Sequence, residues 1–239
     1  MKNKYNKNCY SFPLLIASLL LMSSCNSQVK PLAEATLALE NFDFNTNVSS
    51  LLREKDKSKE YENFWNVKSM VIGIDTVFTD EFDDENRKPI RLDYRPSVYS
   101  ARDKIATFGD MNFYAINMVT TLDNKIMVMS GSVPEVSEQE VKTFVSGMNK
   151  KHGDAVKTTD DFFGPYDIYT WKLADRIIKY CVIYDDESNV LKIEVDKEKK
   201  SLKGVEKTPH YKAYLFTINN KYADQVIGKM NTGDLLYCK

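Results

Sequence analysis

One apolar run near the N-terminus most restricts what this chain can fold into. Residues 13–22 carry no charge and follow a positive segment with Lys2, Lys4 and Lys7. As a helix, ten residues span about 15 Å, half of the roughly 30 Å hydrocarbon core of a membrane. The run is therefore typical of the apolar part of an export signal. No later segment is apolar over about 18 residues, so we expect the rest to fold as a soluble extracytoplasmic body.

The residues that end this run indicate a lipid anchor. Leu21-Met22-Ser23-Ser24-Cys25 resembles the lipobox of bacterial lipoproteins, in which small residues precede a cysteine. The resemblance covers residues 1–25 only. It implies that diacylglycerol is attached to the Cys25 sulfur, that residues 1–24 are removed, and that fatty acids such as palmitate acylate the new amino terminus. The alternative is an ordinary cleaved signal that a cysteine happens to follow.

The resemblance also implies a cellular location. Two or three acyl chains would hold the protein at a membrane, because each buried methylene contributes about 0.8 kcal/mol. Residues 25–40 would then be the lipidated cysteine and its polar tether. Asn26 is not the aspartate associated with inner-membrane retention in some lipoproteins. We therefore expect an outer-membrane anchor with the domain in the periplasm.

The pattern of residues 41–239 predicts an α+β fold: antiparallel sheet packed by a few helices, strand-rich and in one compact domain. A subdivision near residue 100 is the alternative. The clearest element is a helix that begins after Ser137. Glu140 completes a capping box, and Val141 and Phe144 belong to an apolar stripe at helical spacing. Gly153 provides the stop.

Alternating β-branched and aromatic residues predict most of the strands. One hairpin turns through Leu122-Asp123-Asn124, because Asp and Asn accept the left-handed turn conformation. Residues 67–78 alternate little, which predicts a strand covered on both faces. Residues 166–172, 176–185 and 189–196 predict a three-stranded meander. The other predicted elements are a short helix capped by Thr46 or Asn47, strands 113–121, 125–132 and 211–218, and a last helix capped by Asn219 or Asn220.

Two cysteines stay available once the signal is removed and Cys25 carries lipid. In an oxidising compartment Cys181 and Cys238 could form a disulfide, which would contribute roughly 4 kcal/mol in the chain-entropy model. The alternative is a buried small hydrophobic residue at Cys181 and a free thiol at a frayed C-terminus. Both interpretations are open from sequence.

An acidic loop is the first candidate surface for a partner or a cation. Asp80, Glu81, Asp83, Asp84 and Glu85 follow the apolar strand. Carboxylates are ligands for calcium, but the central glycine and terminal glutamate of an EF-hand are missing. A charged surface loop is the other interpretation.

Aromatic residues form the second candidate surface. Phe162, Phe163 and Tyr166 lie in a loop with Gly and Pro, where they could anchor a partner or fold back over the helix and sheet. The same two alternatives hold for the tyrosines of a predicted sheet face, Tyr180, Tyr184, Tyr211 and Tyr214.

The charge balance and the motifs argue against several classes of function. The 33 Lys and Arg residues face 34 Asp and Glu, so the basic excess that nucleic-acid binding needs is missing. There is no Gly-x-Ser-x-Gly, phosphate loop or zinc-ligand spacing. His152 is interpreted as a cation at a helix end rather than a catalytic base. We therefore predict no catalytic residue, no metal and no cofactor.

Three functions remain. The leading hypothesis is a non-enzymatic binding or assembly module that is tethered in the bacterial envelope and contacts a protein or another envelope component. The second is an immunity-type inhibitor of a toxin that acts in the periplasm, with the acidic loop meeting a basic partner. The third is an envelope hydrolase that uses a pair of carboxylates.

Overall fold

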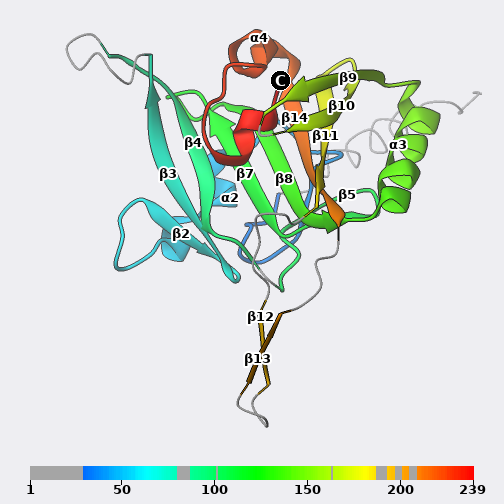
Figure 1. Cartoon of the computed structure of the whole chain (residues 1–239). Helices are drawn as coiled ribbons and strands as arrows, with labels where there is room; N and C mark the ends of the chain where they lie inside the picture. The colour runs from blue at the N-terminus through cyan, green and yellow to red at the C-terminus, as the bar shows by residue number, and fades with distance from the viewer. Residues whose placement is uncertain are drawn as a thin grey trace, which may run out of the picture.

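A large antiparallel sheet organises the computed structural model, which describes residues 29–79, 87–100, 102–162, 164–186, 193–196, 201–204 and 209–239. Within these ranges the sheet has the strand order β2-β3-β4-β7-β8-β14-β11-β10-β9 (Figure 1). Its strands are β2 (Phe64–Val67), β3 (Met70–Phe78), β4 (Pro89–Val98), β7 (Ala115–Thr120), β8 (Ile126–Val136), β14 (His210–Asn219), β11 (Arg176–Asp185), β10 (Pro165–Lys172) and β9 (Val156–Asp161). Cys25, the acidic loop 80–85 and Phe163 lie outside the described residues.

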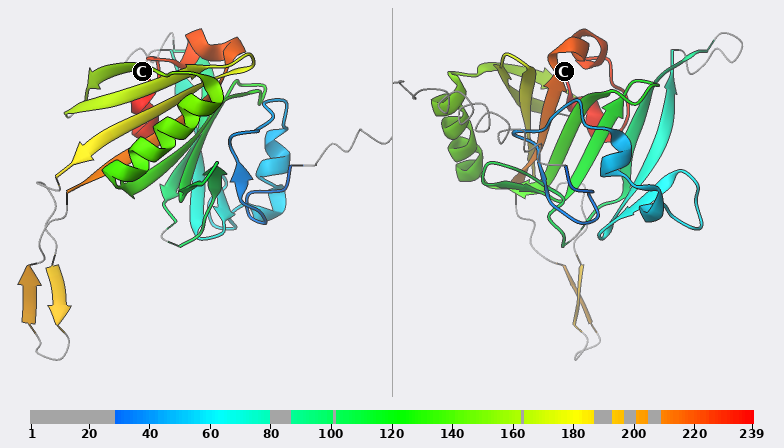
Figure 2. Two further views of the ribbon diagram at one scale, coloured as in Figure 1. Left: turned by 90° about the vertical axis from the view of Figure 1, so that its right-hand side faces the viewer. Right: turned by 180° about the vertical axis from the view of Figure 1, so that it is seen from behind.

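Different segments cover the two faces of this sheet (Figure 2). One face packs against the helix α3 (Glu138–His152), the short helix α2 (Val48–Leu51) and a small sheet of β1 (Leu37–Ala38), β5 (Ala106–Phe108) and β6 (Met111–Phe113). The other face packs against η2 (Asn220–Tyr222), α4 (Ala223–Val226) and the C-terminal turn η3 (Gly233–Tyr237). The protein is strand-rich, with few helices and a single compact body, as the sequence predicted.

The helix α3 forms where its capping signals predicted it. Ser137 is the N-cap, its hydroxyl accepts from the Glu140 amide at 3.2 Å, and its own amide donates to the Glu140 carboxylate at 2.8 Å. Val141 is buried. Gly153 ends the helix with a φ of 85°, a conformation that favours glycine. Start, apolar face and stop are therefore confirmed.

Several predicted strands and caps are confirmed as well. β7 and β8 form the predicted hairpin, and Asn124 takes a φ of 59° in its turn. β10 and β11 pair as predicted, and β14 corresponds to the predicted strand 211–218. Asn47 caps α2, and Asn219 caps η2. The last helix is shorter than predicted, because α4 ends at Val226.

The meander prediction is wrong in its third strand. β12 (Ile193–Asp196) pairs with β13 (Ser201–Gly204) in a separate two-stranded sheet, and the place beside β11 belongs to β14. β11 and β14 pair from Arg176 opposite Asn219 to Asp185 opposite His210, which leaves that edge of β11 no room for a second neighbour. The hairpin β12–β13 projects from the sheet (Figures 1 and 2).

Two other segments differ from expectation. Lys68, with a φ of 55°, turns the chain between β2 and β3, so the predicted strand 67–78 begins at Met70. Its Asp75 and Thr76 are exposed, so it is not covered on both faces. The packed body also begins before residue 41, because Leu32 and Leu39 are buried in the core.

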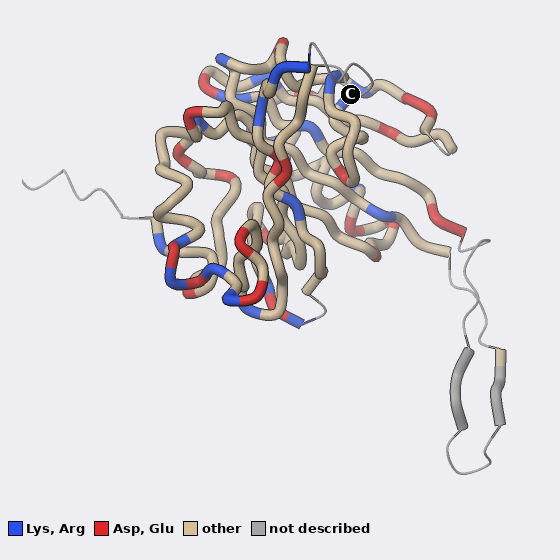
Figure 3. Tube along the Cα trace, turned by 90° about the vertical axis from the view of Figure 1, so that its left-hand side faces the viewer, with Lys and Arg blue, Asp and Glu red and all other residues tan. Residues whose placement is uncertain are grey.

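The turn η1 (Glu54–Asp56) precedes β2. Among the helices that the structure describes, none is long and apolar enough to cross a membrane. On the side shown in Figure 3, basic and acidic residues are interspersed along the trace.

Candidate functional site

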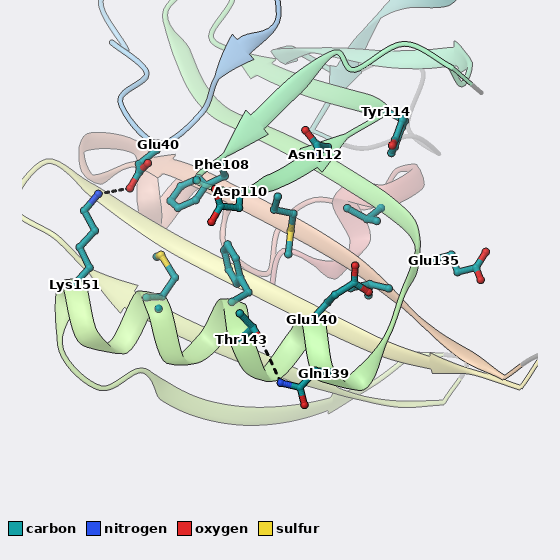
Figure 4. Close-up of a pocket in the computed structure, with 17 residues that line it drawn as sticks. Glu40, Phe108, Asp110, Asn112, Tyr114, Glu135, Gln139, Glu140, Thr143 and Lys151 are labelled. Atoms are coloured by element: carbon teal, nitrogen blue, oxygen red, sulfur yellow. Dashed lines mark hydrogen bonds and ion pairs between the residues drawn. The ribbon is translucent and has the colours of Figure 1, made fainter.

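A cleft of about 570 Å³ lies between α3 and the β5–β6 hairpin (Figure 4). We call it the α3 cleft. Its lining is apolar on the floor and polar at the rim. The apolar lining residues are Phe108, Met111, Val133, Val136, Phe144 and Met148. Clefts of this size with an apolar lining and a few polar groups are the usual form of ligand sites.

The cleft opens where two paired strands separate. The β7–β8 ladder ends with Ala115 opposite Ser132, and the chain before Ala115 leaves β8 to pair with β5 as strand β6. Gly131 permits this departure, because a Cβ there would lie 2.5 Å from Cγ of Phe113. Residues 133–136 of β8 therefore have no strand partner, among the described residues, on the side from which β7 has departed.

A bulge in β8 lies beside the same opening. Tyr211 pairs with Val136 and Ala213 pairs with Val133, so Pro134 and Glu135 together face one residue of β14. A bulge bends its strand and changes where a side chain points, and proline is tolerated there because it has no amide to donate. Glu135 is exposed and lines the cleft beyond the start of α3.

The α3 wall of the cleft contains a glycine in the interior of the helix, where glycine is unfavourable. Gly147 lies in the interior of α3, lines the cleft, and has no atom within 4 Å of the Cβ it lacks. Glycine inside a helix destabilises it by roughly 0.5–1 kcal/mol relative to alanine. A Cβ at this exposed position would meet open space on the cleft wall.

The rim of the cleft carries an excess of carboxylates. Glu40, Asp110, Glu135 and Glu140 line it, and Lys151 forms an ion pair with Glu40 (Figure 4). The hydrogen bonds from Ser137 lower the pKa of Glu140, which is therefore ionised at neutral pH. With its one lysine paired, the rim is negative.

A buried hydroxyl lies beneath the helix wall. Tyr180 is fully buried, and its ring centroid lies 4.6 Å from that of Phe144. Its hydroxyl has no hydrogen-bond partner among the described residues. Burial, and after it the charge of Glu140, raises the pKa of Tyr180, so this group stays a neutral donor.

The two cysteines lie in the same core and are not bonded to each other in the structure. Cys181 on β11 and Cys238 at the C-terminus are buried in the same core cluster on the face opposite α3. The Cys181 thiol donates to the Tyr237 carbonyl at 3.1 Å. Cys238 is 1% exposed, so the C-terminus is packed rather than frayed. The disulfide itself stays a prediction.

The candidate aromatic anchors mostly pack inside the protein. Tyr166 is buried, and its ring lies 5.3 Å from that of Tyr237, which also contacts Phe162 at 5.9 Å. They therefore pack under the C-terminal turn rather than over the helix. The tyrosines of β11 and β14 divide between the two faces: Tyr180 lies under α3, whereas Tyr214 stacks on Tyr237 at 4.6 Å.

The geometry gives the predicted hydrolase little support. Glu140 is held in the capping box by Ser137. Among the described carboxyl groups with a shifted pKa, that of Asp234 alone is raised, chiefly by burial. Asp234 accepts from the Tyr99 hydroxyl at 3.2 Å and belongs to the C-terminal turn, away from the cleft. Burial, and after it Lys151, lowers the pKa of His152, which disfavours the charged imidazole that was expected at the helix end.

Sequence reasoning missed the α3 cleft as a site. Its walls come from segments that carry no motif, and the opening depends on how β6 departs from β8. Two local signals could have located it: Gly147 inside a strong helix, and Pro134 inside a strand. Each residue type is unfavourable in its element and indicates a special position.

Comparisons with known protein families, with curated proteins and with solved structures found no match to this chain.

Proposed function

We propose that this chain is a lipid-anchored protein of the bacterial envelope whose α+β domain faces the periplasm and binds a ligand in the α3 cleft without chemically changing it. The N-terminal residues supply the anchor, by resemblance to the lipobox that ends at Cys25. The cleft supplies the site. This retains the leading hypothesis from the sequence and assigns it a surface.

The observation that carries the proposal is the position of Gly147. An interior helix position occupied by glycine lowers stability, and here the glycine is an exposed residue on the wall of the cleft, with open space where its side chain would begin. The floor, with Met111 and Met148, adds apolar area on flexible side chains that adapt to a ligand. A cleft kept open in a way that lowers stability is expected of a binding site.

The test is photo-crosslinking in intact cells. A benzophenone amino acid replaces Gln139, which lines the cleft, and in a second strain replaces Lys125 in the β7–β8 turn. We expect a specific adduct from position 139 and none from position 125. Gly147→Trp should abolish the adduct by filling the cleft, whereas Ser146→Trp, on an exposed residue that does not line it, should leave it intact.

Equal adducts from positions 139 and 125, or an adduct that persists in Gly147→Trp, would refute the cleft as the binding site. The anchor is tested separately with Cys25→Ala, which should move the protein from the membrane fraction to the soluble fraction. Retention in the membrane fraction would refute the lipobox interpretation.

A further inference from the structure

We propose that the ligand of the α3 cleft is an extended, basic segment of polypeptide, which pairs with the free edge of β8 and places its cationic side chains against Glu135 and its neighbours. This inference rests on the proposed function, because it names the ligand class of the same site. Three observations carry it: the length of the cleft, its charge and the unpaired strand edge.

The cleft continues past the start of α3. A second hollow of about 630 Å³ shares Glu135, Val136 and Glu140 with the first and reaches Tyr184 and Tyr211. In the first hollow alone, the lining runs along α3 from Gln139 to Lys151. That length is about 18 Å at 1.5 Å per residue, and it matches about five residues of extended chain. A compact small molecule would occupy one hollow, whereas an extended segment spans both.

The charge of the residues that line the two hollows favours a cationic ligand. Glu138 lines the second hollow as well, but it forms an ion pair with Lys142, so the excess charge lies on the rim. Lys151 pairs with Glu40, whereas Asp110, Glu135 and Glu140 form no ion pair with a lysine or arginine in the part of the chain that the structure describes. Asp110, Glu135 and Glu140 would repel an anionic ligand. Lysine and arginine side chains complement these carboxylates.

The unpaired edge of β8 favours a polypeptide as the ligand. Beyond Ser132, β8 has lost β7 as a neighbour, and residues 133–136 border the cleft through Val133, Glu135 and Val136. An extended peptide can add a strand to such an edge, where main-chain hydrogen bonds give affinity and alternate side chains give specificity. Because Pro134 has no amide, the edge offers chiefly carbonyl acceptors at that point. Alternate residues of the peptide would then face the apolar floor around Phe144 and Met148.

The experiment uses the full-length lipidated protein in phosphatidylcholine nanodiscs and a fluorescent seven-residue peptide of alternating lysine and leucine. A peptide of alternating glutamate and leucine is the charge control. A lysine–leucine peptide that is N-methylated at alternate positions tests the main-chain pairing. Fluorescence anisotropy, with empty nanodiscs subtracted, gives the affinities. We expect the basic peptide to bind at least about tenfold more tightly than the acidic one, because like charges repel.

Matched variants locate the contact. Asp110→Asn with Glu135→Gln removes two rim charges and should weaken basic-peptide binding about three- to tenfold. Glu60→Gln with Glu62→Gln removes two exposed charges near β2, far from the cleft in sequence, and should leave it unchanged. N-methylation should also weaken binding, since it removes donors to the β8 edge.

Four results would overturn the inference: equal binding of both peptides, insensitivity to the Asp110 and Glu135 changes, an equal effect of the control variant, or full affinity of the N-methylated peptide. If they occur while the position-139 adduct still depends on Gly147, the α3 cleft remains a binding site for another ligand class. If the protein without the Gly147→Trp change also gives no adduct from position 139, both proposals are refuted.

Discussion

Thr232 donates its hydroxyl to the Asp93 carboxylate at 3.0 Å and thereby ties the C-terminal segment to the strand β4. The other oxygen of Asp93 accepts from Arg91 Nε at 2.9 Å, and Arg91 also donates to the Lys229 carbonyl at 3.2 Å. Both side chains of the ion pair are almost completely buried. This small network connects β4 to the C-terminal segment that packs on the face of the sheet opposite α3.

Removing one member of this ion pair should be costly. Arg91→Leu leaves the Asp93 carboxylate buried without its cation, and we expect a loss of about 3–5 kcal/mol in the free energy of unfolding. Urea denaturation at neutral pH measures it. Arg53→Leu, which breaks partly exposed pairs with Asp56 and Glu34, is the control and should cost about 1 kcal/mol or less. Similar losses in the two variants would contradict the importance of burial.

The capping box of α3 makes a prediction with a pH dependence. Ser137→Ala should destabilise the protein by about 1 kcal/mol, as for other N-caps. Ser137 holds the pKa of Glu140 below the value of 4.5 that an unperturbed glutamate has. The stabilising contribution of Glu140 is therefore complete above that value and is lost as the pH falls through the lowered pKa. Glu140→Gln should cost stability at pH 7 and nothing near pH 2; an equal cost at both values would argue against this role.

Gly147→Ala should stabilise the protein. The added methyl group meets open space, and the helix gains roughly 0.5–1 kcal/mol from replacing an interior glycine. Thermal or urea unfolding monitored by far-ultraviolet circular dichroism measures the change. A destabilised variant would show that the position does not face the space assigned to it.

The two buried thiols should be inert in the native protein. Burial raises the pKa of Cys238 to about 12 and also raises that of Cys181, so neither is a thiolate at pH 8. A chromogenic disulfide reagent should detect no thiol in native mature protein purified without reductant, and both thiols in guanidinium. Detection of none in guanidinium as well would show instead that the pair forms the disulfide that the sequence allowed.

Asp234 should destabilise the folded state as the pH rises. Burial raises its pKa above the ordinary value of 3.8, so the folded protein binds this proton more tightly than the unfolded chain does. Below the unfolded pKa both states are protonated and there is no penalty, and the penalty is complete once the pH exceeds the raised pKa. Asp234→Asn keeps an acceptor for Tyr99 and should therefore increase stability at pH 7 but not at pH 3. Reduced stability at both values would contradict this assignment.

Local signals were enough for those elements whose ends are fixed within a few residues. Ser137, Glu140 and Gly153 determine α3 by contacts inside one or two turns, and Asn124 determines the β7–β8 turn in the same way. Their sequence-based predictions agree with the structure because capping and turn chemistry act over short distances.

Features that depend on pairing between distant segments were not accessible in this way. That β14 rather than residues 189–196 lies beside β11 is decided by competition for one strand edge. The burial of Cys238 requires the C-terminal turn to cross the sheet, and the α3 cleft requires β6 to depart from β8. None of these relationships is encoded in the spacing of neighbouring residues.

The position of β14 also imposes an order on how a growing chain can fold. β14 begins at His210, yet it separates β8 from β11 in the finished sheet. A nascent chain that has emerged only as far as residue 209 therefore has two incomplete sheets, each with an open edge. Such edges pair readily with other chains until their proper neighbour arrives. The edges of β8 and β11 therefore stay open to such pairing until residues 210–219 have been made and have taken their place between them.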